Sequence, residues 1–150
     1  MSLTSLWDNA IEIQGQLSAC YAALSRTHRS DASRELKTLA AEEKSHVSAL
    51  RAGKNVALQA PGDSDREKSA KADIESGLES VEDLQAAIES GRIELSEALR
   101  RLSILEEKFE KFFLEASIEA GDFSLKKLFE VLARAYAEHR RRLGRLLAGL

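Results

Sequence analysis

The residues of this chain best suited to chemistry are a glutamate and a histidine on an otherwise apolar helical stripe. A 3-4-3-4 spacing relates Leu36, Leu39, Glu43, His46 and Leu50. This spacing puts all five side chains on one face of a helix, the face expected to be buried. A buried carboxylate and imidazole are costly unless they are paired with each other or bound to a cation. The pattern therefore points to a metal site or a buried polar network.

The second half of the chain repeats the polar pattern of the first half. The paired positions are Gln14 and Glu106, Tyr21 and Phe113, Glu43 and Tyr136, and His46 and His139. The offset is 92 residues for the first two pairs and 93 for the other two, which one extra residue in the second interhelical loop explains. Two helical hairpins related by a pseudo-twofold axis would direct all of these side chains toward one centre.

Apolar residues at helical spacing predict four long helices that would carry these side chains. Their expected ranges are about Thr4 to Arg26, Asp31 to Gly53, Leu95 to Ile118 and Ser124 to Leu147. Turns are expected at residues 27–30, 90–92 and 121–122, where polar residues and glycines gather. Such a pattern predicts an all-α fold, a four-helix bundle with one long crossover between the second and third helices.

The crossover is expected to be irregular at first and then helical. Residues 54–65 contain Pro61 and Gly62, and they are predicted to form a long surface connection. Ser64 and Glu67 make a capping-box pattern that opens a more polar helical stretch to about residue 90. Gly77 is expected to divide that stretch into two short helical segments.

Composition excludes several classes of function. The length of 150 residues suits a single domain. The 22 basic and 25 acidic residues give a net charge of −3, which favours neither nucleic acid nor an acidic protein as a binding partner. The lone Cys20 excludes an intramolecular disulfide and a Cys-x-x-Cys metal knuckle. No apolar run is long enough to span a membrane, and residues 1–10 do not resemble a signal peptide. A cytoplasmic protein is expected.

On these residues the chain resembles the stand-alone rubrerythrin-type members of the ferritin-like di-iron family. The resemblance covers nearly all of residues 1–150 as a single domain, and the stretches that carry it are residues 10–21, 39–46 and 98–113. That family takes one Glu from each of two helices and a Glu-x-x-His from each of the other two. The resemblance implies metal ligands at Glu43, His46, Glu106 and His139, which match this arrangement. Gln14 and Tyr136 stand where it has carboxylates.

The two replaced carboxylates change the metal expected at the site. Glu43 and Glu106 can neutralise one divalent ion, whereas a second ion would leave an uncompensated charge in the core. The sequence therefore favours at most one ion, iron or another divalent metal, at a reduced two-Glu, two-His site. Gln14 can offer a neutral oxygen and Tyr136 a phenolate to a ferric ion. The resemblance implies residual peroxide or oxygen chemistry.

Two other interpretations remain open. The same residues can form an empty hydrogen-bonded network in a non-catalytic ferritin-like interaction or structural protein that has lost metal binding. A homodimer whose interface is its main role is a third alternative, since bundles of the family often pair.

Several charged residues outside this set are expected to lie on the surface. Four glutamates fall off the inner faces of their helices: Glu42, Glu107, Glu110 and Glu138. The arginines of the last helix are expected to interact with its C-terminal end and with nearby acids.

Overall fold

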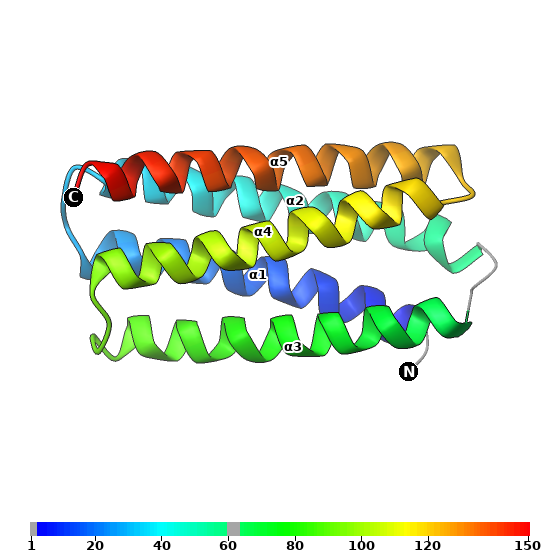
Figure 1. The fold of residues 1–150 in the computed structure, drawn as a ribbon, viewed down its shortest axis with the longest axis horizontal. Helices are drawn as coiled ribbons and strands as arrows, with labels where there is room; N and C mark the ends of the chain where they lie inside the picture. Colours follow the sequence, from blue (N-terminus) through cyan, green and yellow to red (C-terminus); the bar gives the residue numbers. More distant parts are fainter. Residues whose placement is uncertain (1–2, 60–63) are drawn as a thin grey trace.

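The computed structural model describes residues 3–59 and 64–150, with side chains at 7–56, 72–118 and 120–150. Five α-helices and no strand make up this part of the chain. The helices are α1 (Leu3–Thr27), α2 (Ser33–Gln59), α3 (Ser64–Glu89), α4 (Leu95–Glu119) and α5 (Phe123–Ala148). They run side by side along one long axis (Figure 1). The all-α prediction is confirmed. Among these residues, none of the helices combines the length and apolarity that crossing a lipid bilayer requires.

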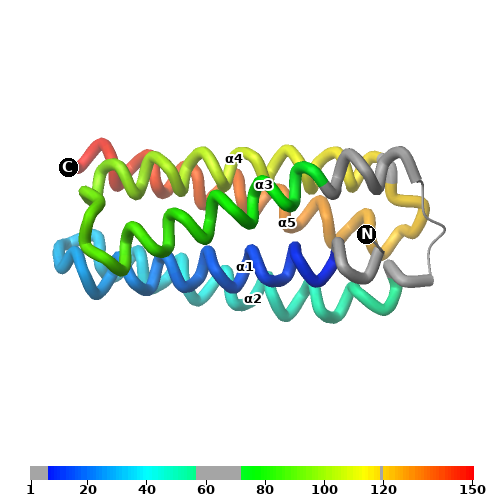
Figure 2. The backbone as a smooth tube through the Cα atoms, turned by 90° about the horizontal axis from the view of Figure 1, so that it is seen from below, coloured from blue at the N-terminus to red at the C-terminus, as the bar shows by residue number. Residues whose placement is uncertain are grey.

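Two helical hairpins form the body of the fold. The most extensive packing joins α4 to α5 and α1 to α2, and the two hairpins lie against each other in Figure 2. Apolar residues at helical spacing on α1 and α2 are fully buried where their side chains are described, among them Ile13, Leu17, Leu36 and Leu39. Asp122 begins α5 as its N-cap by accepting a hydrogen bond from the Leu125 amide at 3.0 Å.

The second helix is longer than the sequence predicts. Gly53, the expected end, lies inside α2, which continues to Gln59, so the long connection predicted for residues 54–65 is wrong. The Pro61-Gly62 pair lies outside the described residues. A helical glycine costs only about 1 kcal/mol relative to alanine. At Gly53 it also permits close packing, because an added Cβ would lie 2.5 Å from Leu128 Cδ2 and 3.4 Å from Trp7 Cζ2.

The crossover is one full helix and not two short segments. α3 runs without a break through Gly77, and its buried positions repeat at helical spacing in Ile74, Gly77, Val81, Leu84 and Ile88. This stripe packs mainly on α1 and much less on α4. A Cβ at residue 77 would lie 3.0 Å from the Cζ atom of the Phe109 ring. Close packing therefore explains the glycine, and the expected division at this residue is wrong.

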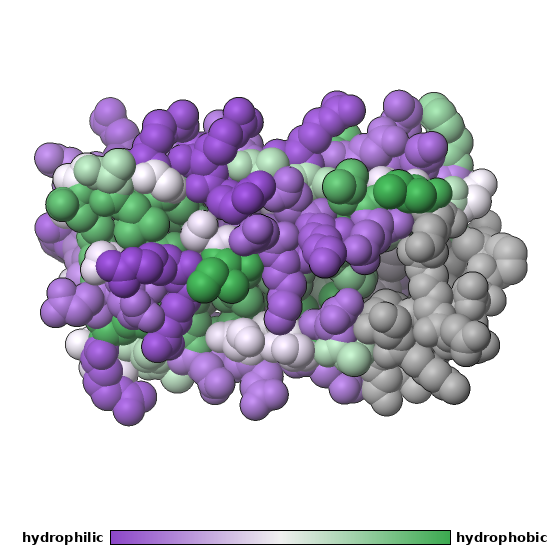
Figure 3. Space-filling view, viewed as in Figure 1, coloured by the Kyte–Doolittle hydropathy of each residue, from purple (hydrophilic) through white to green (hydrophobic). Residues whose placement is uncertain are grey.

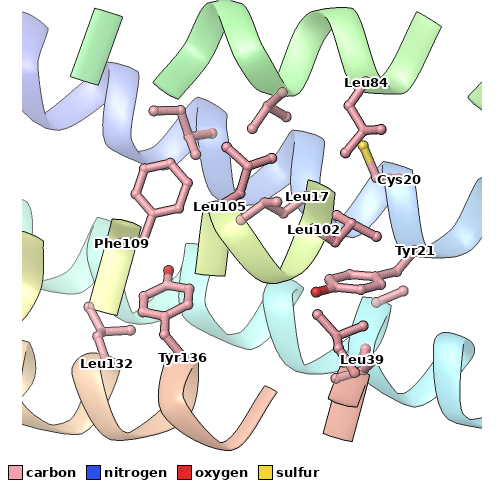
Figure 4. Packing of buried hydrophobic residues seen from close by; sticks show 14 of the residues in the cluster. Leu17, Cys20, Tyr21, Leu39, Leu84, Leu102, Leu105, Phe109, Leu132 and Tyr136 are labelled. Atoms are coloured by element: carbon pink, nitrogen blue, oxygen red, sulfur yellow. The ribbon is translucent and has the colours of Figure 1, made fainter. Parts of the chain in front are cut away.

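The described interior is mostly apolar, and the charged side chains buried in it belong to one small group. Figure 4 shows Leu17, Leu102 and Leu105 filling the space between the helices, with Tyr21 and Tyr136 among them. Cys20 is buried, as expected, and burial together with the nearby charge of Glu89 raises its pKa to about 12. The face of the molecule shown in Figure 3 carries many hydrophilic residues, with separate hydrophobic patches between them.

Candidate metal centre

Three of the four predicted ligands meet in the interior between the hairpins. α2 supplies Glu43, α4 supplies Glu106 and α5 supplies His139, with exposed fractions of 0%, 0% and 1%. Each residue offers one ligand atom, and these three atoms lie within 4.8 Å of one another. Each side chain sits at a position of the inner stripe of its helix, so the burial of that stripe brings the three together.

Glu43 forms hydrogen bonds with both histidines of this group. Its Oε1 lies 2.9 Å from Nδ1 of His139, and its Oε2 lies 3.2 Å from Nδ1 of His46. Nδ1 of His139 also lies 3.4 Å from Oε1 of Glu106. The Tyr21 hydroxyl donates a 2.7 Å hydrogen bond to the same Glu106 oxygen. The centre thus joins α1, α2, α4 and α5.

The fourth predicted ligand, His46, lies at the edge of this group. Its side chain is 13% exposed, and it reaches the centre through its hydrogen bond with Glu43. Its ring stacks on that of His139 with centroids 5.4 Å apart. The two histidines therefore lie side by side on the same carboxylate, with His139 inside and His46 nearer to solvent.

Gln14 and Tyr136, which the internal repeat pairs with Glu106 and Glu43, are also inside. Gln14 is 1% exposed and Tyr136 is 0% exposed. Among the described residues, no hydrogen-bond partner reaches Gln14 Oε1, Glu106 Oε2 or the Tyr136 hydroxyl. A buried polar atom without a partner costs about 1–3 kcal/mol. The unpartnered Glu106 oxygen belongs to a group of two carboxylates and an imidazole, which are the kinds of donor that bind a divalent cation, so the residues present fit a metal ion.

The two halves of the internal repeat also differ in the aromatic residues that surround the centre. Tyr21 hydrogen-bonds Glu106, whereas its counterpart Phe113 has no hydroxyl and stacks on Tyr136 with centroids 5.6 Å apart and planes 11° apart. Phe109 packs against the same ring at 6.1 Å. Tyr136 therefore sits in an aromatic stack on the α5 side of the centre, next to Phe109 and Leu132 in Figure 4.

The protonation of the group follows from burial and from these hydrogen bonds. Burial opposes ionisation of Glu43, but hydrogen bonds with His139 and His46 outweigh it and lower the pKa to about 2. Burial and the charge of Glu43 raise the pKa of Glu106 well above its usual value. Burial also opposes protonation of His139, yet its bonds to Glu106 and Glu43 raise its pKa to about 10. Without a cation, a charged His139–Glu43 pair faces a protonated Glu106.

One residue near the centre was not predicted to approach it. Glu42 was expected on the surface, and its side chain is indeed 43% exposed, but its Oε2 lies 3.9 Å from Nε2 of His139. The same oxygen accepts a 2.6 Å hydrogen bond from Nη1 of Arg142. Arg142 also pairs with Glu35, in line with the expected contacts of the α5 arginines with nearby acids. A sequence signal did exist, because Glu35 and Glu42 are seven residues apart and Arg142 follows His139 by three.

Comparison with models of known protein families, with curated proteins and with solved structures finds no match to this chain. Function is therefore inferred from the geometry of the centre.

Proposed function

We propose that this protein binds a single divalent metal ion, iron or another transition metal, through Glu43, Glu106 and His139. We also propose that its bundle is a ferritin-like, rubrerythrin-type domain whose metal site has two carboxylate ligands fewer than the family pattern. One observation carries the metal proposal: three buried ligand atoms within 4.8 Å of one another, next to an unpartnered Glu106 oxygen. His46 supports Glu43 from the solvent side, and the unpartnered oxygens of Gln14 and Tyr136 are candidates for further ligands.

Charge favours one ion over two. Glu43 and Glu106 bring two negative charges once Glu106 has lost its proton, which balances one divalent cation. A second cation would need further anions that Gln14 does not supply, in a core where unbalanced charge is costly. Mixed carboxylate and imidazole donors suit Fe(II), Mn(II) and Zn(II). A bound iron would supply one-electron chemistry toward oxygen or peroxide.

The residues around the ion have roles of their own. Tyr21 fixes Glu106 by its 2.7 Å hydrogen bond and so limits the directions that the carboxylate can take. The complete burial of Glu43 and Glu106 excludes bulk water and strengthens every electrostatic interaction in the centre. His139 and Glu106 each hold a proton that a cation must displace, so binding is expected to release protons.

A second candidate function is a non-catalytic interaction or structural role for the same bundle. The close pairing of Glu43 with His139 at 2.9 Å favours it, because that pair balances its own charge without a cation. Under this alternative the polar centre is a buried network that only fixes how the two hairpins pack together.

Metal titration of matched variants separates the two functions. Calorimetry with Fe(II) under anaerobic conditions, and with Mn(II) and Zn(II), is expected to give one ion per chain for the unmodified protein. Glu106→Gln is expected to lose that binding, whereas Glu107→Gln is expected to keep it, since Glu107 is the neighbouring carboxylate with a 66% exposed side chain. Absence of binding, or equal binding by both variants, would contradict the metal proposal and favour the structural role.

A further inference from the structure

A buried centre needs a path by which its ion arrives. His139 is 1% exposed, and its Nδ1 faces Glu43 and Glu106 inside the bundle. Its other ring nitrogen, Nε2, faces outward and lies 3.9 Å from Oε2 of Glu42. Glu42 is 43% exposed, so a chain of polar groups runs from solvent through Glu42 to the ring of His139. A carboxylate at this position can attract a cation from solution.

That carboxylate is not free to do so in this conformation. Nη1 of Arg142 donates a 2.6 Å hydrogen bond to the very oxygen of Glu42 that faces His139. The guanidinium is also bound by Glu35, and its side chain is only 11% exposed. Arg142 is thus held from two sides by α2, and its charge neutralises Glu42. A guanidinium keeps its charge at every accessible pH, so it also repels an approaching cation.

We propose that Glu42 is the carboxylate through which the ion reaches the centre, and that Arg142 is the gate that must release Glu42 first. This inference rests on the proposed metal site. In the closed state, Arg142 holds the Glu42 oxygen that faces His139 and so blocks both arrival and departure of the ion. When Arg142 swings into solvent, Glu42 becomes an unpaired carboxylate beside the buried ring. The gate then sets the rate of metal exchange.

The last helix offers a matched control for this idea. Arg141, the residue before the gate, has a 70% exposed side chain and pairs with Glu138 on its own helix. Arg141→Gln and Arg142→Gln therefore remove the same charge from neighbouring positions, and only one of them faces Glu42. Glu35→Gln provides a milder opening of the gate, because it removes one of the two bonds that hold Arg142 and leaves the arginine in place.

Stopped-flow uptake of Co(II) by the full chain, followed by its visible absorption, tests the gate. Arg142→Gln is expected to speed uptake by about tenfold or more, and to speed release as well, because the closed gate blocks both directions. Glu35→Gln is expected to speed them by a smaller factor, and Arg141→Gln is expected to match the unmodified protein. Adding Glu42→Gln to Arg142→Gln is expected to slow uptake again, because the attracting carboxylate is then gone.

The outcomes separate the gate from the metal site itself. If the unmodified protein takes up Co(II) and all of the arginine and glutamate variants share its rates, the gate is wrong while the metal site stands. An ion that instead passes His46, the other partly exposed residue of the centre, would give that result. If the unmodified protein takes up no Co(II), the metal site and the gate both fail.

Discussion

Replacing Glu43 with glutamine tests the centre most directly, because this carboxylate contacts both histidines. The amide has nearly the size of the carboxylate but carries no charge, so its hydrogen bonds to His139 and His46 become neutral ones. Charge-assisted hydrogen bonds contribute about 1.5–3 kcal/mol each and neutral ones about 0.5–1.5 kcal/mol. In a chelator, the variant is therefore expected to lose about 1–3 kcal/mol of unfolding free energy.

The effect on metal binding adds to this loss and is of similar size. An ion at a hundredfold excess over its Kd stabilises the folded protein by about 2.7 kcal/mol. For a chain of this size, each kcal/mol shifts Tm by about 2–4 °C, so metal is expected to raise the Tm of the unmodified protein by roughly 5–11 °C. In Glu43→Gln only Glu106 remains to balance a divalent charge, and the shift is expected to vanish.

Differential scanning calorimetry of both proteins, in chelator and in excess Mn(II) or Zn(II), measures the two effects together. Glu107→Gln is the control, since its carboxylate lies on the outer face of α4 with a 66% exposed side chain. It is expected to keep both the Tm in chelator and the shift with metal. An equal metal-dependent shift in Glu43→Gln and in the unmodified protein would refute the assignment of Glu43 as a ligand.

Three further predictions concern pH, packing and the hydrogen bond to the second carboxylate. In chelator, stability is expected to fall above neutral pH, because the stabilisation from protonated His139 is complete below its ordinary pKa of 6.5 and is lost as the pH rises through about 10. Thermal melts of His139→Gln are expected to show a smaller fall over the same range, and an equal fall would contradict the pairing. Gly15→Ala is expected to add about 0.5–1 kcal/mol, since nothing lies within 4 Å of the new methyl group, whereas Gly77→Ala is expected to destabilise, since its methyl group meets an aromatic ring at 3.0 Å. Urea denaturation compares the two, and equal shifts would refute this account of the packing. Tyr21→Phe is expected to weaken metal binding by about 10–100-fold without changing its stoichiometry, because Glu106 loses the bond that orients it; calorimetry would contradict this if the affinity were unchanged.

The helices were predictable where the signal is local. Inner stripes such as Leu36 and Leu39 on α2 follow from spacing alone, because residues three and four apart share a helix face. The predictions at Gly53 and Gly77 were wrong because the effect of a glycine depends on what packs against it. Leu128 and Phe109, which occupy the space beside these glycines, come from other helices, and the sequence does not state which helices are neighbours.

The polar centre was predictable in part for a similar reason. Spacing and the internal repeat selected Glu43, Glu106 and His139, which the fold brings together, and the same reasoning selected His46, which lies at the edge. The spacing of Glu35 and Glu42 places both on one face of α2, but the approach of Glu42 to His139 also depends on how α5 is rotated against α2, which the spacing does not determine. The ferritin-like family and the identity of the metal stay predictions.

The pairing of helices that are neighbours in sequence has a consequence for how the protein folds. Because α1 packs chiefly on α2, and α4 chiefly on α5, most contacts close only short loops, which favours fast formation of each hairpin. Neither hairpin alone contains the whole centre, since Glu43 comes from one and Glu106 and His139 from the other. The cluster can assemble only when the two halves dock, so capture of a cation would report the completion of folding.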